Sequence, residues 1–216
     1  MKTYFQIGTN DGNDNFRELC IKHKPDMIVL VEANSKHLNS IQNNYKSFVN
    51  VHTINKAIYY NDNEEVELFI PAKDGIYGQP GGAGNHTYTD GNFSLLPMND
   101  WGEKKNMCSF KATTIKFDTI CEQLNITDIE YLQIDTEGFD SEIIKMIDLD
   151  KYNIKNIRYE KWGFSTECFT KYNSDDNLNN YGIEGMKLVE QKLKKYNYKL
   201  RDIIDRDGND IIATKL

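Results

Sequence analysis

The sequence contains little arginine, few cysteines and no long apolar run, and each shortage excludes a class of protein. Asp and Glu number 33 against 26 Lys and Arg, a net charge of −7, whereas nucleic-acid-binding proteins usually carry a basic stripe. The four cysteines form no Cys-x-x-Cys pair, which argues against a zinc knuckle or a disulfide framework. No apolar run approaches the roughly 18 residues of a membrane span. We therefore expect neither a nucleic-acid partner nor a membrane span.

The start and the length of the chain predict a cytoplasmic protein of one domain. Met1-Lys2-Thr3 leads directly into a strand-like segment, without the apolar core of a signal peptide. A single domain of this size buries roughly 70% of its accessible surface, which is enough for a substantial core. We therefore predict one domain over residues 1–216, and no sequence pattern indicates its oligomeric state.

Buried-type strands alternate with amphipathic helices along most of the chain. We expect helices after the capping residues Asp14 and Ser35 and over Phe117–Leu124, Ser141–Ile147 and Gly182–Tyr196. The expected strands are Tyr4–Ile7, Met27–Val31, Val51–Ala57, Glu65–Ile70, Tyr131–Ile134 and Asn156–Glu160, followed by a hairpin of Tyr198–Ile204 and Asp210–Lys215. The alternation predicts an α/β fold with a doubly wound, mostly parallel sheet. The Asp-Gly turn chemistry predicts that the sheet ends in an antiparallel hairpin.

A glycine-rich stretch at about 71–108 interrupts this alternation. Seven glycines lie between Pro71 and Cys108, with little periodicity around them. A long irregular segment inside a compact domain is usually a functional loop. We expect it to lie on the substrate side of the site and to select the substrate.

The turn after the first strand has the form of a ligand-binding loop. Gly8 and Gly12 permit tight turning and a close approach of a ligand to the backbone, although such turns also occur as plain connections. Asp11 and Asp14 lie where a pyrophosphate would bind, and their charge disfavours a diphosphate there. Acidic side chains suit a cationic ligand better.

A carboxylate follows the second strand, about 20 residues after the glycine turn. Glu32 at this distance is placed to hold the hydroxyls of a ribose, and capping of the next helix is the competing interpretation. The acidic glycine loop and Glu32 together describe a site for a positively charged nucleoside. S-adenosylmethionine, which carries a sulfonium and an amino group, fits that description.

Three acids follow the buried strand Tyr131–Ile134. Asp135, Glu137 and Asp140 are expected at one cleft mouth, with Glu160 beside them at the end of the next strand. Asp140 is expected to cap the following helix. The other acids can hold a donor amino group, accept a proton or bind a divalent cation, and the cation is the less favoured alternative.

These motifs resemble the FkbM family of S-adenosylmethionine-dependent methyltransferases. The resemblance rests on Gly8-Thr9-Asn10-Asp11-Gly12, Glu32-Ala33-Asn34, Ser94-Leu95, Thr113–Asp118, Ile134-Asp135-Thr136-Glu137-Gly138 and Asp210–Ala213, and it spans Tyr4 to Lys215. Two positions depart from the family pattern: Gln6 replaces an acid, and Ala33 replaces a proline. The resemblance implies a class I, Rossmann-like fold with a seven-stranded sheet, and S-adenosylmethionine as methyl donor.

The resemblance also implies roles for individual residues. The residues implied in donor binding are Gly8, Thr9, Asn10, Asp11 and Gly12 in the loop, Glu32 at the ribose, Ala33 next to it in the sequence, Asn34, Lys56 and Ala57 near the adenine, and Asp135 near the reacting methyl group.

The strand-end acids and the family resemblance favour methylation of a hydroxyl on a sugar, a glycan or another small molecule. A hydroxyl has a high pKa, so its attack calls for a general base. The candidates are Asp135, Glu137, Glu160 and His86. Two alternatives stay open: a catalytically silent binding module with the same fold, and an NAD-linked oxidoreductase, which Asp11 and Asp14 disfavour.

Overall fold

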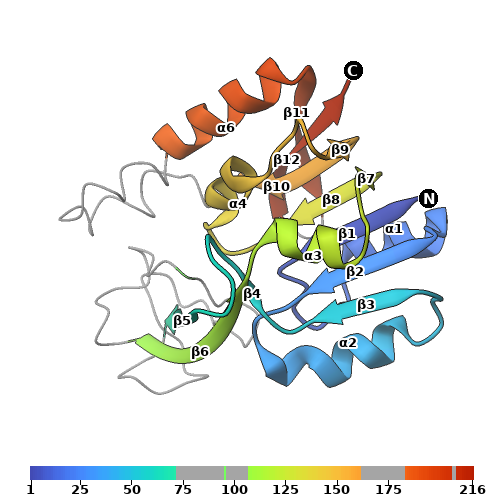
Figure 1. The fold of residues 1–216 in the computed structure, drawn as a ribbon, viewed down its shortest axis with the longest axis vertical. Coiled ribbons are helices and arrows are strands. Elements are labelled where there is room, and N and C mark those ends of the chain that lie inside the picture. The colour runs from blue at the N-terminus through green and yellow to red at the C-terminus, as the bar shows by residue number, and fades with distance from the viewer. Residues whose placement is uncertain (72–94, 96–106, 162–182, 206–207) are drawn as a thin grey trace.

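The computed structural model describes residues 1–71, 95, 107–161, 183–205 and 208–216, and its centre is a seven-stranded sheet (Figure 1). The strands are β1 (Thr3–Ile7), β2 (Met27–Val31), β3 (Val51–Ile54), β8 (Tyr131–Ile134), β10 (Asn156–Glu160), β11 (Tyr198–Asp205) and β12 (Gly208–Lys215). Their order is β11-β12-β10-β8-β1-β2-β3. All neighbours pair in parallel except β12, which is antiparallel to β10 and β11. The predicted parallel sheet with a closing antiparallel hairpin is confirmed.

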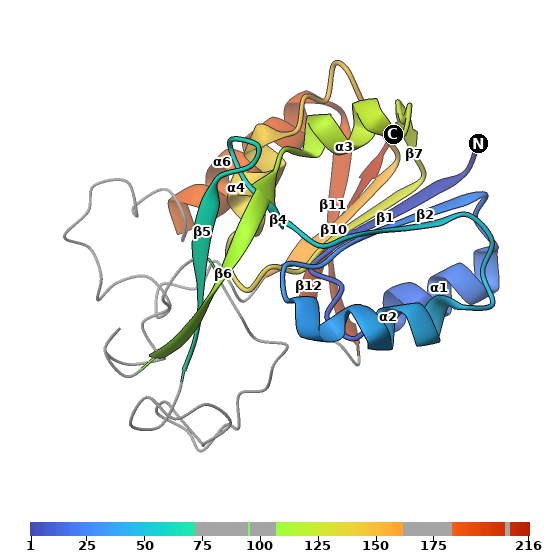
Figure 2. The same ribbon diagram turned by 60° about the horizontal axis from the view of Figure 1, so that its bottom comes forward.

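Helices cover both faces of this sheet (Figure 2). The helices α1 (Asn15–His23) and α2 (Leu38–Tyr45) lie on one face, and α3 (Phe117–Gln123), α4 (Asp140–Met146) and α6 (Ile183–Lys195) lie on the other. The central strands β1, β2 and β8 are buried along their whole length, because both of their faces meet helices. None of the helices in the described ranges is long and apolar enough to cross a membrane.

The starts of three helices test the expected caps. Asp14 caps α1, and its Oδ1 accepts a hydrogen bond from the backbone N–H of Arg17 at 3.0 Å. The expected cap Ser35 is wrong: Asn34 caps a short 3₁₀ turn over Ser35–His37, and α2 follows it. The expected cap Asp140 is also wrong, because it is the first residue of α4 and makes no side-chain cap.

A small second sheet stands beside the main one. It has the order β4-β6-β5 and consists of β4 (Ala57–Ile58), β5 (Glu65–Pro71) and β6 (Met107–Ile115). The single strand predicted over Val51–Ala57 is therefore wrong. β3 ends at Ile54, where the Asn55 side chain donates to the Glu32 carbonyl at 2.7 Å, and the chain then changes sheet.

The glycine-rich stretch begins and ends in strand. The strand predicted over Glu65–Ile70 is confirmed as β5, and it pairs antiparallel with β6, from Glu65 opposite Thr113 to Pro71 opposite Met107. Figure 2 shows this hairpin pointing away from the main sheet. Between β5 and β6 only Leu95 lies within the described residues. A further small parallel pair, β7 (Asp128–Ile129) and β9 (Asn153–Ile154), lies elsewhere in the fold.

Candidate functional site

A pocket opens where the strand order reverses, at the carboxyl ends of β1, β2 and β8. Such a reversal is the usual ligand site of an open α/β sheet. One part of the wall is polar and consists of Asn10, Glu32, Lys56, Asp135, Thr136 and Glu137. The rest consists of Gly8 and the apolar residues Ile7, Val31, Ala33, Ala57, Ile58, Leu68, Leu95, Phe139 and Ile143.

Gly8 lets the ends of β1 and β8 come together. Its φ is +80°, and a Cβ built there would lie 1.7 Å from the carbonyl oxygen of Asp135. The adjoining backbone is tied by hydrogen bonds from the Asp135 N–H to the Ile7 carbonyl and from the Gly8 N–H to the Val31 carbonyl, both 2.9 Å. Glycine is required here by a close approach of the protein's own backbone.

Glu32 lies at the pocket wall with both carboxylate oxygens engaged. Its exposed fraction is 8%. Oε2 accepts from the backbone N–H of Asn10 and Oε1 from that of Asn34, each at 2.7 Å. Burial raises the pKa of Glu32, while these backbone hydrogen bonds act to lower it. Each oxygen has a second lone pair, so this carboxylate can also accept hydrogen bonds from the hydroxyls of a ligand.

Two further carboxyl groups, at the ends of β8 and β10, hold their protons more tightly than usual. Burial raises the pKa of Asp135 well above its ordinary value, and the charges of Glu137 and Asp140 add to the shift. Burial also raises the pKa of Glu160, with further contributions from Glu137 and Asp135. Acids and bases at functional sites commonly have perturbed pKa values of this kind.

The pocket brings together many of the residues singled out from the sequence, but not all. Those that line it are Gly8, Asn10, Glu32, Ala33, Lys56, Ala57, Asp135 and Glu137. Those that lie outside its lining are Thr9, Asp11, Gly12, Asn34, Asp140 and Glu160. His86 lies outside the described residues.

Asp11 departs most clearly from expectation. It was expected in the cleft, but it is exposed. Its Oδ1 accepts from the backbone N–H of Asn13 at 2.9 Å, so the side chain is used in a local turn. The other loop acid, Asp14, accepts from the Gln6 side chain and caps α1. The carboxyl groups of the pocket therefore come from Glu32, Asp135 and Glu137. Burial favours their neutral form, and a cationic ligand beside them would favour the ionised form.

The described part of the chain holds no group of three or more His, Cys, Asp or Glu side chains placed to bind a metal ion. Burial raises the pKa values of Asp135 and Glu160, and the charge of Glu137 adds to both shifts. What this arrangement offers chemically is a negative lining and proton acceptors.

Apart from Ala33 and Ala57, the apolar residues of the pocket wall were not predicted as site residues from the sequence. Ile58 and Leu68 come from the small sheet, and Leu95 from the connection between its strands. Leu68 of β5 is paired with Phe110 of β6. This pairing joins residues some 40 positions apart in the sequence. Local periodicity carries no signal for such a contact. Phe139 and Ile143, at the start of α4, complete the wall.

Comparison with known proteins places the chain in a family. The family model described as the methyltransferase FkbM domain matches residues 6–200, and no curated protein matches the sequence. Similar solved structures include the Methanococcus jannaschii fibrillarin pre-rRNA processing protein, with 9% identity, 99% of this chain and 66% of that chain covered, and a TM-score of 0.45.

Two more solved structures are similar at the same distant level. One is M. capricolum TrmK in complex with S-adenosyl-homocysteine, with 12% identity, 99% and 62% coverage and a TM-score of 0.44. The other is an Aquifex aeolicus SAM-dependent methyltransferase, with 8% identity, 100% and 82% coverage and a TM-score of 0.40. The chain thus spans less than two thirds of the length of the first two structures.

The family match extends from Gln6 in β1 to Leu200 in β11 and so includes every strand end that forms the pocket. It confirms the resemblance drawn from the glycine loop and the Asp135-Thr136-Glu137-Gly138 motif. The chain belongs to the FkbM methyltransferase family, with a class I, Rossmann-like fold.

Proposed function

We propose that the protein transfers the methyl group of S-adenosylmethionine to a hydroxyl of a sugar, a glycan or another small molecule. The observation that carries this proposal is the charge of the pocket. Among the described residues, three carboxyl groups line it, from Glu32, Asp135 and Glu137, against one ammonium, that of Lys56. A negative pocket at the switch point of the sheet favours a cationic nucleoside over a diphosphate.

The two parts of the pocket wall match the two parts of this donor. Ala57, Ile58 and Phe139 offer an apolar slot for the adenine ring. Glu32 is placed to accept hydrogen bonds from the ribose hydroxyls, as strand-end acids do in related α/β folds. In this arrangement the sulfonium and the amino group of the donor face Asp135 and Glu137.

Methyl transfer in such a site is an in-line displacement. The acceptor oxygen attacks the methyl carbon, the carbon–sulfur bond breaks, and its electron pair stays on sulfur. The hydroxyl proton passes to a carboxylate, so the products are a methyl ether, S-adenosylhomocysteine and a protonated acid. Most of the rate comes from holding the two reactants in line. Asp135, Glu137 and Glu160 are the proposed bases, because their strand ends adjoin the pocket.

Titration calorimetry with S-adenosylmethionine tests this function. Replacing Glu32 by Gln keeps the shape of the side chain but removes its charge. Hydrogen bonds to a charged group contribute about 1.5–3 kcal/mol each, so we expect Glu32→Gln to raise the Kd at least about tenfold.

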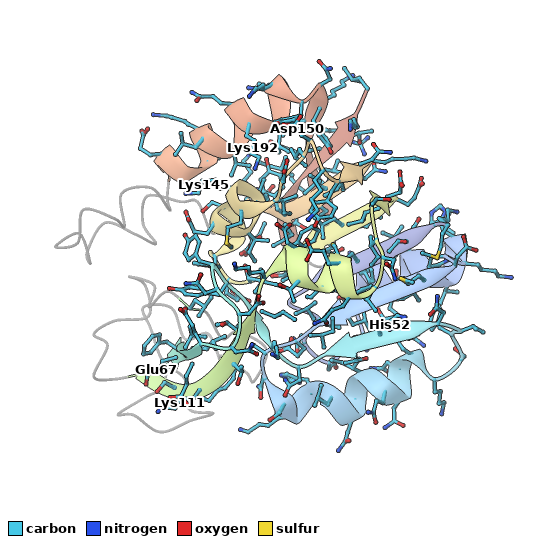
Figure 3. All side chains as sticks on the ribbon, in the orientation of Figure 1. His52, Glu67, Lys111, Lys145, Asp150 and Lys192 are labelled. Atoms are coloured by element: carbon cyan, nitrogen blue, oxygen red, sulfur yellow. The ribbon has the colours of Figure 1, made fainter. Side chains whose placement is uncertain are left out.

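The matched control is Glu67→Gln. Glu67, labelled in Figure 3, is exposed on β5, where it accepts from the Ser109 hydroxyl, and it is not part of the pocket lining. We expect this variant to bind like the wild type. Folded wild-type protein that binds no S-adenosylmethionine at about millimolar concentration would remove the proposal. Binding without methyl transfer to any hydroxyl acceptor would reduce the protein to a binding module.

A further inference from the structure

A single buried carboxylate joins the ends of two neighbouring strands at the edge of the pocket. Asp140 has an exposed fraction of 1%. Its Oδ1 accepts from both the backbone N–H and the hydroxyl of Thr136. Its Oδ2 accepts from the backbone N–H of Glu160 at 2.9 Å. The loop after β8 is thereby bonded to the last residue of β10.

The loop that Asp140 holds has an unusual backbone. Glu137 has a φ of +53° and Gly138 a φ of +99°, and a left-handed non-glycine residue persists only where its surroundings determine it. This loop carries two of the three pocket carboxyl groups, those of Asp135 and Glu137. Its conformation therefore decides where the negative charge of the pocket lies.

We propose that Asp140 is a positioning residue of the methyl-transfer site. It lies outside the pocket lining and acts through its neighbours, because it holds Asp135 and Glu137 at one strand end and Glu160 at the next in one arrangement. The inference rests on the proposed function, since S-adenosylmethionine is the ligand through which the arrangement is measured.

The number of hydrogen-bond donors around position 140 explains why an aspartate is needed there. Three donors meet the two oxygens of Asp140, and an ionised carboxylate has acceptor sites for all of them. Burial raises the pKa of Asp140, while these hydrogen bonds oppose that shift. An asparagine has one acceptor oxygen and an NH₂ group. In this position its NH₂ would face the N–H of either Thr136 or Glu160.

The test compares Asp140→Asn with a variant that weakens the same helix at its other end. Lys192 of α6, labelled in Figure 3, donates to the carbonyls of Ile144 (3.0 Å), Lys145 (2.8 Å) and Ile147 (2.6 Å). These carbonyls belong to the C-terminal end of α4, whereas Asp140 begins it. Lys192→Met therefore controls for a general loss of α4 stability.

Two measurements are made on both variants: the Kd for S-adenosylmethionine and the exchange rates of the Thr136 and Glu160 amide protons. For Asp140→Asn we expect a Kd at least about tenfold higher and faster exchange of both amides. For Lys192→Met we expect a lower melting temperature, a Kd within about twofold of the wild type and unchanged exchange at these two amides.

A folded Asp140→Asn protein with wild-type affinity would overturn the inference, and so would an equal loss of affinity in Lys192→Met. If Asp140→Asn does not fold, Asp140→Glu keeps the carboxylate but moves it by one methylene. We then expect a Kd at least about fivefold higher, and wild-type affinity in this variant would overturn the inference. If the wild type itself binds no S-adenosylmethionine, the proposed function fails, while the exchange of the Glu160 amide still tests the role of Asp140.

Discussion

Glu160 lowers the stability of the folded protein by the same property that suits it to act as a base. Its Oε2 is buried without a hydrogen-bond partner among the described residues. Burial and the charges of Glu137, Asp135 and Asp140 raise its pKa well above the ordinary value. A carboxylate in such surroundings costs folding free energy, and a raised pKa makes it a better proton acceptor near neutral pH.

The raised pKa of Glu160 gives the stability of the protein a defined dependence on pH. Between the unfolded and the folded pKa the folded state binds more protons, so stability falls as pH rises through that window. Glu160→Gln removes this loss. We expect the variant to be more stable than the wild type by about 1–2 kcal/mol at about pH 8, and equal to it below about pH 4. Urea denaturation at both pH values measures the difference. Equal stability at the higher pH would contradict the assignment.

For single residues, the sequence predicts which acids follow buried strands and so lie at the site. It does not predict which acids are used instead in a local turn or in a contact with a distant strand. Glu32 and Asp135 could be placed at one site, because the carboxyl ends of parallel strands meet at one edge of a sheet. Asp11 could not be excluded from it, because its turn with Asn13 depends on backbone geometry. The partner of Asp140, the N–H of Glu160, lies 20 positions away and follows only from the packing of β8 against β10.

The contact between β1 and β8 is the element-level feature on which the pocket depends. The two strands pair in parallel from Tyr4 opposite Tyr131 to Ile7 opposite Ile134. Beyond the paired residues, Gly8 lies directly against the Asp135 carbonyl. A side chain at this position would push the two strand ends apart, and the pocket wall with them.

Gly8→Ala tests this contact. The added Cβ would lie 1.7 Å from a backbone oxygen and require a φ of +80°, so we expect a loss of about 3 kcal/mol or more in unfolding free energy. Gly12→Ala is the comparison, because its Cβ would lie 2.9 Å from the Tyr45 ring at a φ of +73°. We expect it to cost less, since a side chain can yield where a backbone cannot. Chemical denaturation of both variants measures the two losses, and equal losses would count against this explanation.

The sequence predicts the strands of the main sheet, which alternate with helices, but not the arrangement of the strands of the small sheet. β1, β2, β8 and β10 are marked by short apolar runs, and all four lie in the main sheet as predicted. β4 carries no separate signal, because it consists of only two residues, Ala57 and Ile58, and follows β3 after a gap of two residues. The pairing of β5 with β6 joins segments on either side of the glycine-rich stretch, and sequence periodicity does not encode such a partner.

For the whole molecule, the proposed function depends on the charge of the groups at the switch point of the sheet. The net charge of −7 agrees with an acceptor other than nucleic acid, which stays a prediction, as does the cytoplasmic location. At the pocket, the acidic side chains of the lining are Glu32, Asp135 and Glu137. Lys56, the cation of its lining, donates to the Asn63 side chain at 2.8 Å.

The most direct test compares the affinity of the same protein for S-adenosylmethionine and for NAD. Both contain adenosine, but S-adenosylmethionine carries a sulfonium next to the ribose where NAD carries a pyrophosphate. The comparison therefore contrasts a cationic with an anionic group at this position of the pocket. We predict that S-adenosylmethionine binds at least about a hundredfold more tightly, a difference of about 2.7 kcal/mol. Equal or tighter binding of NAD would contradict the account.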